Sequence, residues 1–204
     1  MLGEIRFEPG VKSAGKRASG VKNNLEAPRE SAMLGCLNGI VMGRLVSNPE
    51  YQRACLPLRV ATPYYSRYTQ GMQYGSHVDD PVMGEGQRYR SDISITVFLN
   101  EPGDYAGGEL CIETEFGEQK VKLPAGSAVT YPSSSLHRVA EVTAGERLVA
   151  VTWLQSMVRD AAKRRLLYQL GKARESLFDH APELEATNQV DHTYVNLVRM
   201  WGDV

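Results

Sequence analysis

Between residues 92 and 154 the chain holds a series of short apolar segments separated by turns that contain glycine and proline. The clearest is residues 92–99, in which apolar side chains alternate along the segment. Others follow at residues 109–113, 119–123, 127–131, 138–142 and 147–154. Many short strands at regular spacing, with no helical pattern between them, predict an antiparallel sandwich or barrel of the jelly-roll kind. A parallel α/β sheet would need helices between the strands.

Helical spacing of apolar residues occurs on both sides of this series. Residues 28–46 carry an apolar stripe that stops at Asn48-Pro49, and a second short helix is expected at residues 49–55. After Gln155 we expect one long helix, a break at residues 180–182 and a last amphipathic helix. We therefore predict a mainly β fold with flanking helices. Residues 1–155 would form the β domain with its N-terminal helical segment, and residues 156–204 a C-terminal helical extension packed on it.

Composition limits the function classes. The 204 residues are 42% hydrophobic, which is enough for one well-packed domain with a small appendage. The net charge of −1 offers no basic field for nucleic acid, and no apolar run approaches the roughly 20 residues of a membrane helix. Residues 1–10 do not resemble a secretory signal. The three cysteines form no CxxC pair and are expected to be buried and reduced, which favours a cytoplasmic protein.

Three side chains are candidates for a metal site. Residues 74–79 resemble the end of a strand, where alternation would place His77 and Asp79 on the same side. A His-x-Asp pattern alone more often marks polar surface than a metal site. His137, in the run Tyr-Pro-Ser-Ser-Ser-Leu-His, supplies a third ligand. Two histidines and a carboxylate on one face are the arrangement used by non-haem Fe(II) oxygenases.

Two further residues are candidates for binding an anion. Arg147 begins an apolar strand and shares a face with Val149, Val151 and Trp153. If that face is interior, the guanidinium needs an anion, and a dicarboxylate fits its paired N–H donors. An arginine at a strand edge facing water is the equally weighted alternative. Tyr68 lies on the strand before His77, and its hydroxyl is a candidate donor to the same ligand, although half-buried strand tyrosines are common.

Several segments of the sequence resemble the bacterial PKHD-type hydroxylases, which are relatives of prolyl and lysyl hydroxylases among the Fe(II)/2-oxoglutarate-dependent dioxygenases. The resemblance covers nearly the whole chain and is carried by residues 23–24, 66–68, 77–79, 90–94, 105–110, 121–126, 131–137 and 153–160. The family usually opens with a strand and a helix before the glycine-rich segment, and this chain begins after them. The resemblance therefore implies a short form or a fragment.

The resemblance implies a double-stranded β-helix core, of the jelly-roll or cupin-like kind, with flanking helices. It implies that His77, Asp79 and His137 bind Fe(II), that Arg147 binds 2-oxoglutarate, and that ascorbate keeps the iron reduced. The reaction would be hydroxylation of an unidentified small-molecule or peptide substrate by O2, coupled to decarboxylation of 2-oxoglutarate to succinate and CO2. Arg90 and the loop at residues 81–87 are candidate surroundings for that substrate.

Two other functions are compatible with the residue patterns alone. One is a cupin-like metal-dependent hydrolase or isomerase that holds zinc with the same three residues, although such an enzyme has no need of a buried arginine for a dicarboxylate. The other is a non-catalytic β-sandwich binding module. The helical tail is compatible with bracing the sheet or with a homo-oligomer contact.

Overall fold

The computed structural model describes residues 3, 5–13, 18–84 and 86–203. The chain divides into two compact units, and each is described by itself below. The first comprises Met1–Gly43 and Val60–Leu154, and the second comprises Arg44–Arg59 and Gln155–Val204.

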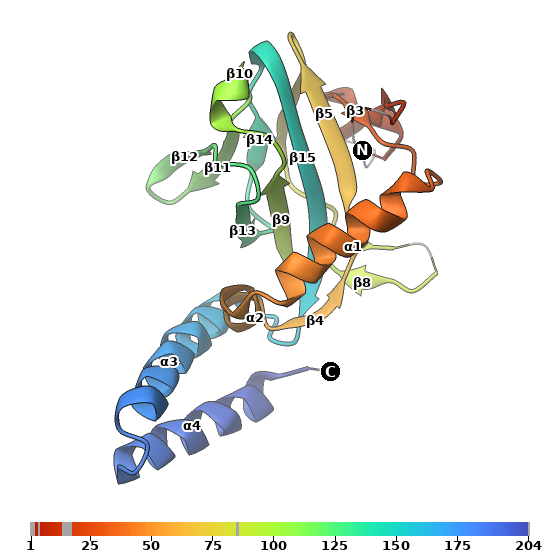
Figure 1. Cartoon of the computed structure of the whole chain (residues 1–204). Helices are drawn as coiled ribbons and strands as arrows, with labels where there is room; N and C mark the ends of the chain where they lie inside the picture. The colour runs from red at the N-terminus through yellow and green to blue at the C-terminus, as the bar shows by residue number, and fades with distance from the viewer. Residues whose placement is uncertain (1–2, 4, 14–17, 85, 204) are drawn as a thin grey trace. The chain divides into compact units, whose positions relative to one another are not determined.

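The first unit is built from two antiparallel sheets and a short ribbon (Figure 1). The larger sheet follows the order β1-β3-β5-β15-β9-β13, and β10 also pairs with β15. Its strands are β1 (Glu8–Pro9), β3 (Leu25–Glu26), β5 (Tyr64–Thr69), β9 (Ile93–Phe98), β10 (Tyr105–Gly107), β13 (Ala128–Pro132) and β15 (Val142–Ser156). The strand β4 (Pro57–Val60) spans the boundary between the two units.

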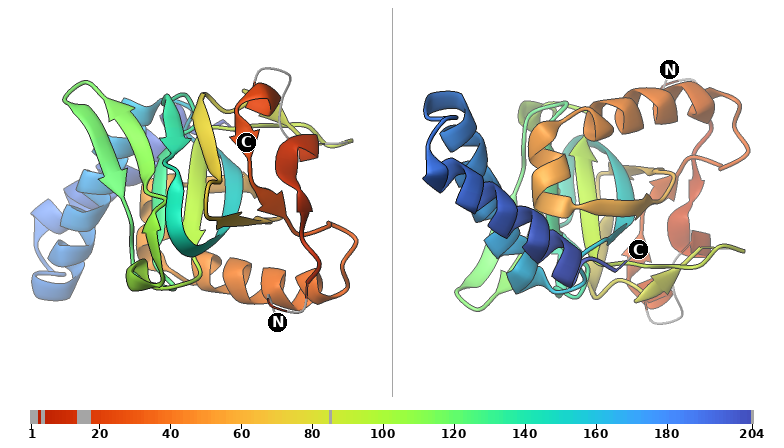
Figure 2. Two further views of the ribbon diagram at one scale, coloured as in Figure 1. Left: turned by 90° about the horizontal axis from the view of Figure 1, so that it is seen from above. Right: turned by 90° about the horizontal axis from the view of Figure 1, so that it is seen from below.

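The smaller sheet follows the order β12-β11-β14-β6-β2, and Figure 2 lets both sheets be followed from above and below. Its strands are β2 (Lys22–Asn23), β6 (Gln73–His77), β11 (Leu110–Thr114), β12 (Gly117–Val121) and β14 (His137–Val139). The ribbon pairs β7 (Val82–Met83) with β8 (Tyr89–Arg90), and short 3-10 turns lie at Gly10–Ser13, Ala18–Gly20 and Pro102–Asp104. The strand series predicted from the sequence is confirmed, except that no turn separates residues 142 and 147, where β15 is continuous.

The core of this unit lies along β9 and β15. All six residues of β9 are buried. Both faces of this strand are therefore covered by other parts of the protein, as expected for a central strand. β15 runs between β5 and β9, which Figure 1 shows as neighbouring arrows. One apolar cluster brings together Tyr68, Phe98, Tyr105, Val139, Val142 and Val149 from five strands. This packing fixes the inward-facing side chains of β5 and β15.

The helix α1 (Met33–Val46) begins five residues later than its sequence pattern predicts. The prediction of a start at Pro28 is wrong because residues 28–31 form a turn, in which the Ser31 N–H donates to the Pro28 carbonyl at 3.1 Å. In the first unit Leu34 and Val41 are the buried side of the helix. The Tyr65 hydroxyl donates to Asn38 Oδ1 at 3.1 Å, which fastens the helix to β5.

The second unit is helical. It contains α2 (Pro49–Cys55), α3 (Ala161–His180) and α4 (Glu185–Trp201), as the apolar spacing predicts. Asn48 caps α2 and Asp160 caps α3, each with a side-chain oxygen on backbone N–H groups of the first turn. A cluster of Leu56, Val158 and Leu167 forms its core, with Trp201 packed against it. Within the described residues, no helix combines the length and apolar character that crossing a membrane requires.

The cysteines differ from one another. Cys55 and Cys111 are buried, as predicted, but Cys36 is exposed on α1. The expectation that all three are buried is therefore wrong for Cys36. Apolar neighbours in the sequence do not reveal which side of a helix faces the sheet.

Candidate metal centre and co-substrate site

His77 and His137 are direct partners across the antiparallel pairing of β6 and β14. His77 is the last residue of β6, and His137 is the first residue of β14. Paired residues of neighbouring strands place their side chains close together on one face, and the two imidazole ring centres lie 4.3 Å apart. The pairing of two short strands therefore brings together histidines that are 60 positions apart in the sequence.

Backbone carbonyls orient both imidazole rings. His77 Nδ1 lies 2.8 Å from the Gly75 carbonyl, and His137 Nδ1 lies 3.0 Å from the Ser135 carbonyl. Because a carbonyl only accepts, each Nδ1 carries the hydrogen, and each Nε2 of a neutral ring keeps a free lone pair. The carbonyl that orients His137 belongs to the last serine of the run that precedes it in the sequence.

Asp79 completes the group two residues beyond the end of β6. Its Oδ1 lies 3.8 Å from Nε2 of His77 and 3.8 Å from Nε2 of His137. Its Oδ2 is occupied by two donors: Ser94 Oγ at 2.5 Å and the Trp153 indole N–H at 2.8 Å. The carboxylate is therefore held by one oxygen and presents the other to the two free imidazole nitrogens.

A hydrogen-bond chain continues behind Asp79. Ser94 Oγ also lies 2.8 Å from Ser133 Oγ, and both serines are buried. Since the single Ser94 hydrogen goes to the carboxylate, Ser133 donates to Ser94. Ser94 pairs with Tyr131 on one side and with Trp153 on the other, so β13, β9 and β15 together position the carboxylate.

The three ligand atoms fit a first-row metal ion. They lie within 4.8 Å of one another, and the three side chains are each less than a tenth exposed. Ligands at right angles around such an ion lie roughly 3 Å apart, so the group is slightly wider than a bound arrangement. Burial and the neighbouring His137 lower the pKa of His77, which keeps its nitrogen free of a proton at neutral pH. Three ligands on one side leave the opposite positions for other molecules.

Arg147 is buried on β15 of the larger sheet, whereas the two histidines lie on the smaller sheet. It is 1% exposed and pairs directly with Tyr68 across β15 and β5. Its guanidinium carbon lies 5.0 Å from the Tyr68 ring centre. Among the described residues no carboxylate pairs with it, and its Nε is buried without a hydrogen-bond partner. Burial lowers the pKa of Arg147, yet a guanidinium keeps its charge in proteins, so this cation requires an anion.

Tyrosine hydroxyls surround the guanidinium. Tyr68, Tyr105 and Tyr131 all interact with its charge. Burial raises the pKa of Tyr68 to about 12 and raises the pKa of Tyr131 further, so both are donors at neutral pH. The Tyr131 ring also meets His137 edge-on, with ring centres 5.0 Å apart. Tyr131 therefore adjoins both His137 and the guanidinium.

Other polar residues in the same unit have structural partners. Arg67 forms an ion pair with Glu146 and is not free for a ligand. Arg90 pairs with Asp92 through two hydrogen bonds of 2.7 and 3.0 Å. Tyr74 stacks on the His77 ring, with centres 3.8 Å apart, and so supports the ligand. His180 and His192 are exposed on the helices of the second unit.

Aromatic and cationic side chains continue outward from Asp79. Trp153, which donates to Asp79, meets the Tyr64 ring edge-on at 5.6 Å between ring centres. The exposed Arg29 covers the Tyr64 ring, with its guanidinium carbon 4.2 Å from the ring centre. This row leads from the carboxylate to solvent.

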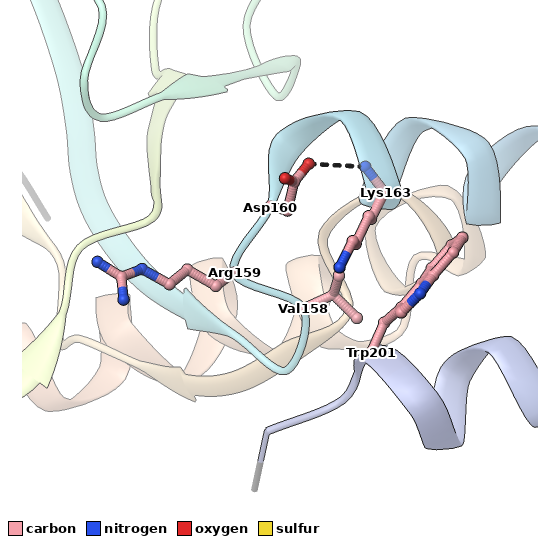
Figure 3. Close-up of a pocket in the computed structure, with 5 residues that line it drawn as sticks. All are labelled: Val158, Arg159, Asp160, Lys163 and Trp201. Carbon is pink, nitrogen blue, oxygen red and sulfur yellow. Dashed lines mark hydrogen bonds between the residues drawn. The ribbon is translucent and has the colours of Figure 1, made fainter.

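A hollow in the second unit has a different character. It is lined by Val158, Arg159, Asp160, Lys163 and Trp201. Figure 3 shows Asp160 bonded to the Lys163 backbone and Arg159 pointing away from the other side chains. The Lys163 ammonium lies 5.4 Å from the Trp201 ring centre. These contacts cap and pack helices, and they hold no group of ligand-binding or catalytic character.

Comparison with known proteins decides the family. The model of the 2OG-Fe(II) oxygenase superfamily matches residues 63–155, which include His77, Asp79, His137 and Arg147. A PKHD-type hydroxylase of Thioalkalivibrio sulfidiphilus is 52% identical over 205 residues, covering 100% of this chain and 92% of the relative. One from Acaryochloris marina is 43% identical over 203 residues, covering 100% and 91%. This chain belongs to the PKHD-type hydroxylases.

Solved structures agree with this fold. An oxidoreductase of the 2OG-Fe(II) oxygenase family from Burkholderia pseudomallei aligns with a TM-score of 0.51 at 15% identity, over 74% of this chain and 73% of that one. A prolyl-4-hydroxylase from Pseudomonas putida aligns with a TM-score of 0.50 at 19% identity, over 74% and 78%. The predicted jelly-roll fold is confirmed, and as a PKHD-type hydroxylase the chain is a 2-oxoglutarate-dependent dioxygenase that requires Fe(II).

Sequence reasoning missed several residues around the site of this PKHD-type hydroxylase. Ser94 and Trp153 hold Asp79, Tyr131 adjoins both Arg147 and His137, and Tyr105 adjoins Arg147. Alternation along β15 places Trp153 on the same face as Arg147, and this pattern could have indicated that Trp153 belongs to the site. Ser94 had none, since its role depends on the register between strands.

Proposed function

We propose that this PKHD-type hydroxylase binds Fe(II) through Nε2 of His77, Nε2 of His137 and Oδ1 of Asp79. The far carboxylate of 2-oxoglutarate is held by Arg147, and the Tyr68 hydroxyl donates to the same ligand. The observation that carries the proposal is the combination of two features in one unit. Three oriented ligand atoms face one another, and a buried guanidinium nearby has no acid among the described residues.

When bound, Fe(II) supplies the redox chemistry of the reaction with O2. That chemistry couples the decarboxylation of 2-oxoglutarate, which yields succinate and CO2, to the hydroxylation of a substrate. The protein's residues supply position and shielding. The Gly75 and Ser135 carbonyls fix the imidazole tautomers, and Ser94 with Trp153 fixes the carboxylate. Arg147 is buried beside an apolar cluster, and in such low-dielectric surroundings its attraction for a carboxylate is stronger than at the surface.

We propose that the substrate, a small molecule or a peptide, approaches along Trp153, Tyr64 and Arg29. This row starts at the carboxylate ligand and ends at the surface, whereas Arg90 is already paired with Asp92. The loop at residues 81–87 stays a candidate neighbour of the substrate. The ring faces of Tyr64 and Trp153 offer a flat apolar contact, and Arg29 offers a charge.

The remaining properties are proposed on composition and family resemblance. We expect a cytoplasmic protein that does not bind nucleic acid or membranes, because its net charge is −1 and the helices of the described part of the chain lack the apolar length. Ascorbate as a reductant follows from the family alone. A homo-oligomer and the division into domains 1–155 and 156–204 stay predictions.

A binding and turnover assay tests the proposal. Fe(II) and 2-oxoglutarate are added to the purified protein without oxygen, and the visible charge-transfer band is recorded before air is admitted and succinate is measured. We expect both signals in the wild type and in His192→Ala, which alters an exposed histidine. His137→Ala is expected to lose both, and Arg147→Ala to lose the band while still binding iron. Equal signals in wild type and His137→Ala would refute the iron site.

The same assay separates the two other functions. A zinc-dependent hydrolase or isomerase would bind metal at these residues but release no succinate. A non-catalytic module would be unaffected by His77→Ala. The buried guanidinium of Arg147, whose Nε has no partner among the described residues, favours the dioxygenase, since neither alternative needs a buried carboxylate site.

A further inference from the structure

Tyr105 carries a buried polar group whose purpose the fold does not explain. The residue is 5% exposed, and its hydroxyl hydrogen has no acceptor among the described residues, since the neighbouring Arg147 can only donate. A buried hydroxyl without a partner costs on the order of 1 to 3 kcal/mol, so such groups are rare unless a ligand uses them. Phenylalanine would fill the same apolar cluster without that cost.

The pairing of β10 with β15 brings the Tyr105 side chain close to Arg147. Tyr105 on β10 is the direct partner of Gly145 on β15. Gly145 and Arg147 are two residues apart on one strand, so they share a face, and Tyr105 becomes a diagonal neighbour of Arg147. The tyrosine hydroxyl and the guanidinium interact.

Gly145 makes this approach feasible. Its φ is +72°, and a Cβ at this position would lie 2.1 Å from the Asp104 carbonyl oxygen. Any other residue would push β10 away from β15. The Tyr105 ring is fixed from the other direction by Lys122, whose ammonium lies 3.9 Å from the ring centre and donates to the Tyr105 carbonyl at 2.7 Å.

We propose that the Tyr105 hydroxyl is a further donor to the far carboxylate of 2-oxoglutarate, beside Arg147 and Tyr68, and that it makes the site selective for a keto acid with two acid groups. The inference rests on the proposed function. Two neighbouring buried donors, Tyr105 Oη and Arg147 Nε, both lack an acceptor, and one carboxylate has two oxygens to satisfy them. Burial raises the pKa of Tyr105, so the group is a donor at neutral pH.

The test compares two ligands on the Mn(II)-loaded protein, by titration calorimetry without turnover. 2-Oxoglutarate carries the far carboxylate, whereas oxalate chelates the metal and lacks it. For Tyr105→Phe we expect the dissociation constant of 2-oxoglutarate to rise roughly tenfold or more and that of oxalate to change less than about twofold. Tyr51→Phe is the matched control, because Tyr51 is also buried with an unpartnered hydroxyl but lies in the second unit.

Three outcomes overturn the inference. An unchanged 2-oxoglutarate affinity in Tyr105→Phe, with a large loss in Arg147→Ala, refutes the role of Tyr105 and leaves the proposed function intact. Equal weakening of both ligands shows a general structural effect, which a thermal melt of the variant would detect independently. A wild type that binds oxalate but not 2-oxoglutarate refutes both proposals together.

Discussion

Arg147 lies directly opposite Tyr68 in the pairing of β15 with β5, and the guanidinium sits over the tyrosine ring inside an apolar cluster. A charge in that position is costly when nothing neutralises it. In this chain the cost is linked to binding, because the same burial that destabilises the free protein strengthens the hold on an incoming carboxylate. Stability and co-substrate affinity at this site are therefore expected to change in opposite directions.

Arg147→Met tests that relationship. Methionine fills a similar volume without a charge, so we expect the metal-loaded protein without co-substrate to be as stable as the wild type or more stable, by up to about 4 kcal/mol. 2-Oxoglutarate should raise the melting temperature of the wild type and leave that of the variant unchanged. Chemical denaturation and thermal melts with and without the keto acid measure both effects. A variant that is destabilised and still responds to 2-oxoglutarate would contradict this account.

Trp153→Phe tests the support of Asp79. The substitution removes the indole donor to Oδ2 and leaves Ser94 as the only one of the two observed donors. We expect metal affinity to fall about 10- to 100-fold, as is usual when a partner of a ligand is lost. Calorimetric titration with Mn(II) measures the change, and Trp201→Phe in the second unit is the matched control. Equal Mn(II) affinity in the two variants would show that Trp153 does not support the metal ligand Asp79.

Tyr68→Phe tests the burial of the phenol. The folded protein holds the pKa of Tyr68 at about 12, against an ordinary value of 10.0. As pH rises past 10, the unfolded chain loses this proton first, so stability present at neutral pH is lost up to about pH 12. The loss is on the order of 2 to 3 kcal/mol. Chemical denaturation at pH 8 and pH 11.5 measures the free energy of unfolding at each pH. Between these pH values the variant should lose less of it than the wild type, and an identical loss in both proteins would refute the raised pKa of Tyr68.

Much of the fold and the site could be predicted from the sequence because the signals are local. Alternation and turn residues define the strands, and the helix α2 begins and ends where Asn48-Pro49 and residue 55 indicate. His77, Asp79 and His137 were chosen by residue type and spacing, and the structure brings them together. Arg147 was chosen because a charged residue on an apolar strand face needs a partner.

The remaining features depend on contacts between segments that are distant in sequence. Ser94 reaches Asp79 only because β9 and β15 pair in one particular register, which periodicity within a strand does not specify. Tyr105 meets Arg147 for the same reason, through its pairing with Gly145. The exposure of Cys36 depends on which side of α1 packs against the sheet.

The most direct test of the account is a crystal structure of the protein with Mn(II) and N-oxalylglycine, an unreactive analogue of 2-oxoglutarate, using anomalous scattering to locate the metal. We predict one metal peak at bonding distance, about 2 Å, from Nε2 of His77, Nε2 of His137 and Oδ1 of Asp79, with the far carboxylate of the analogue on Arg147. A peak away from any of these three atoms, or an analogue whose far carboxylate points away from Arg147, would contradict the central claim.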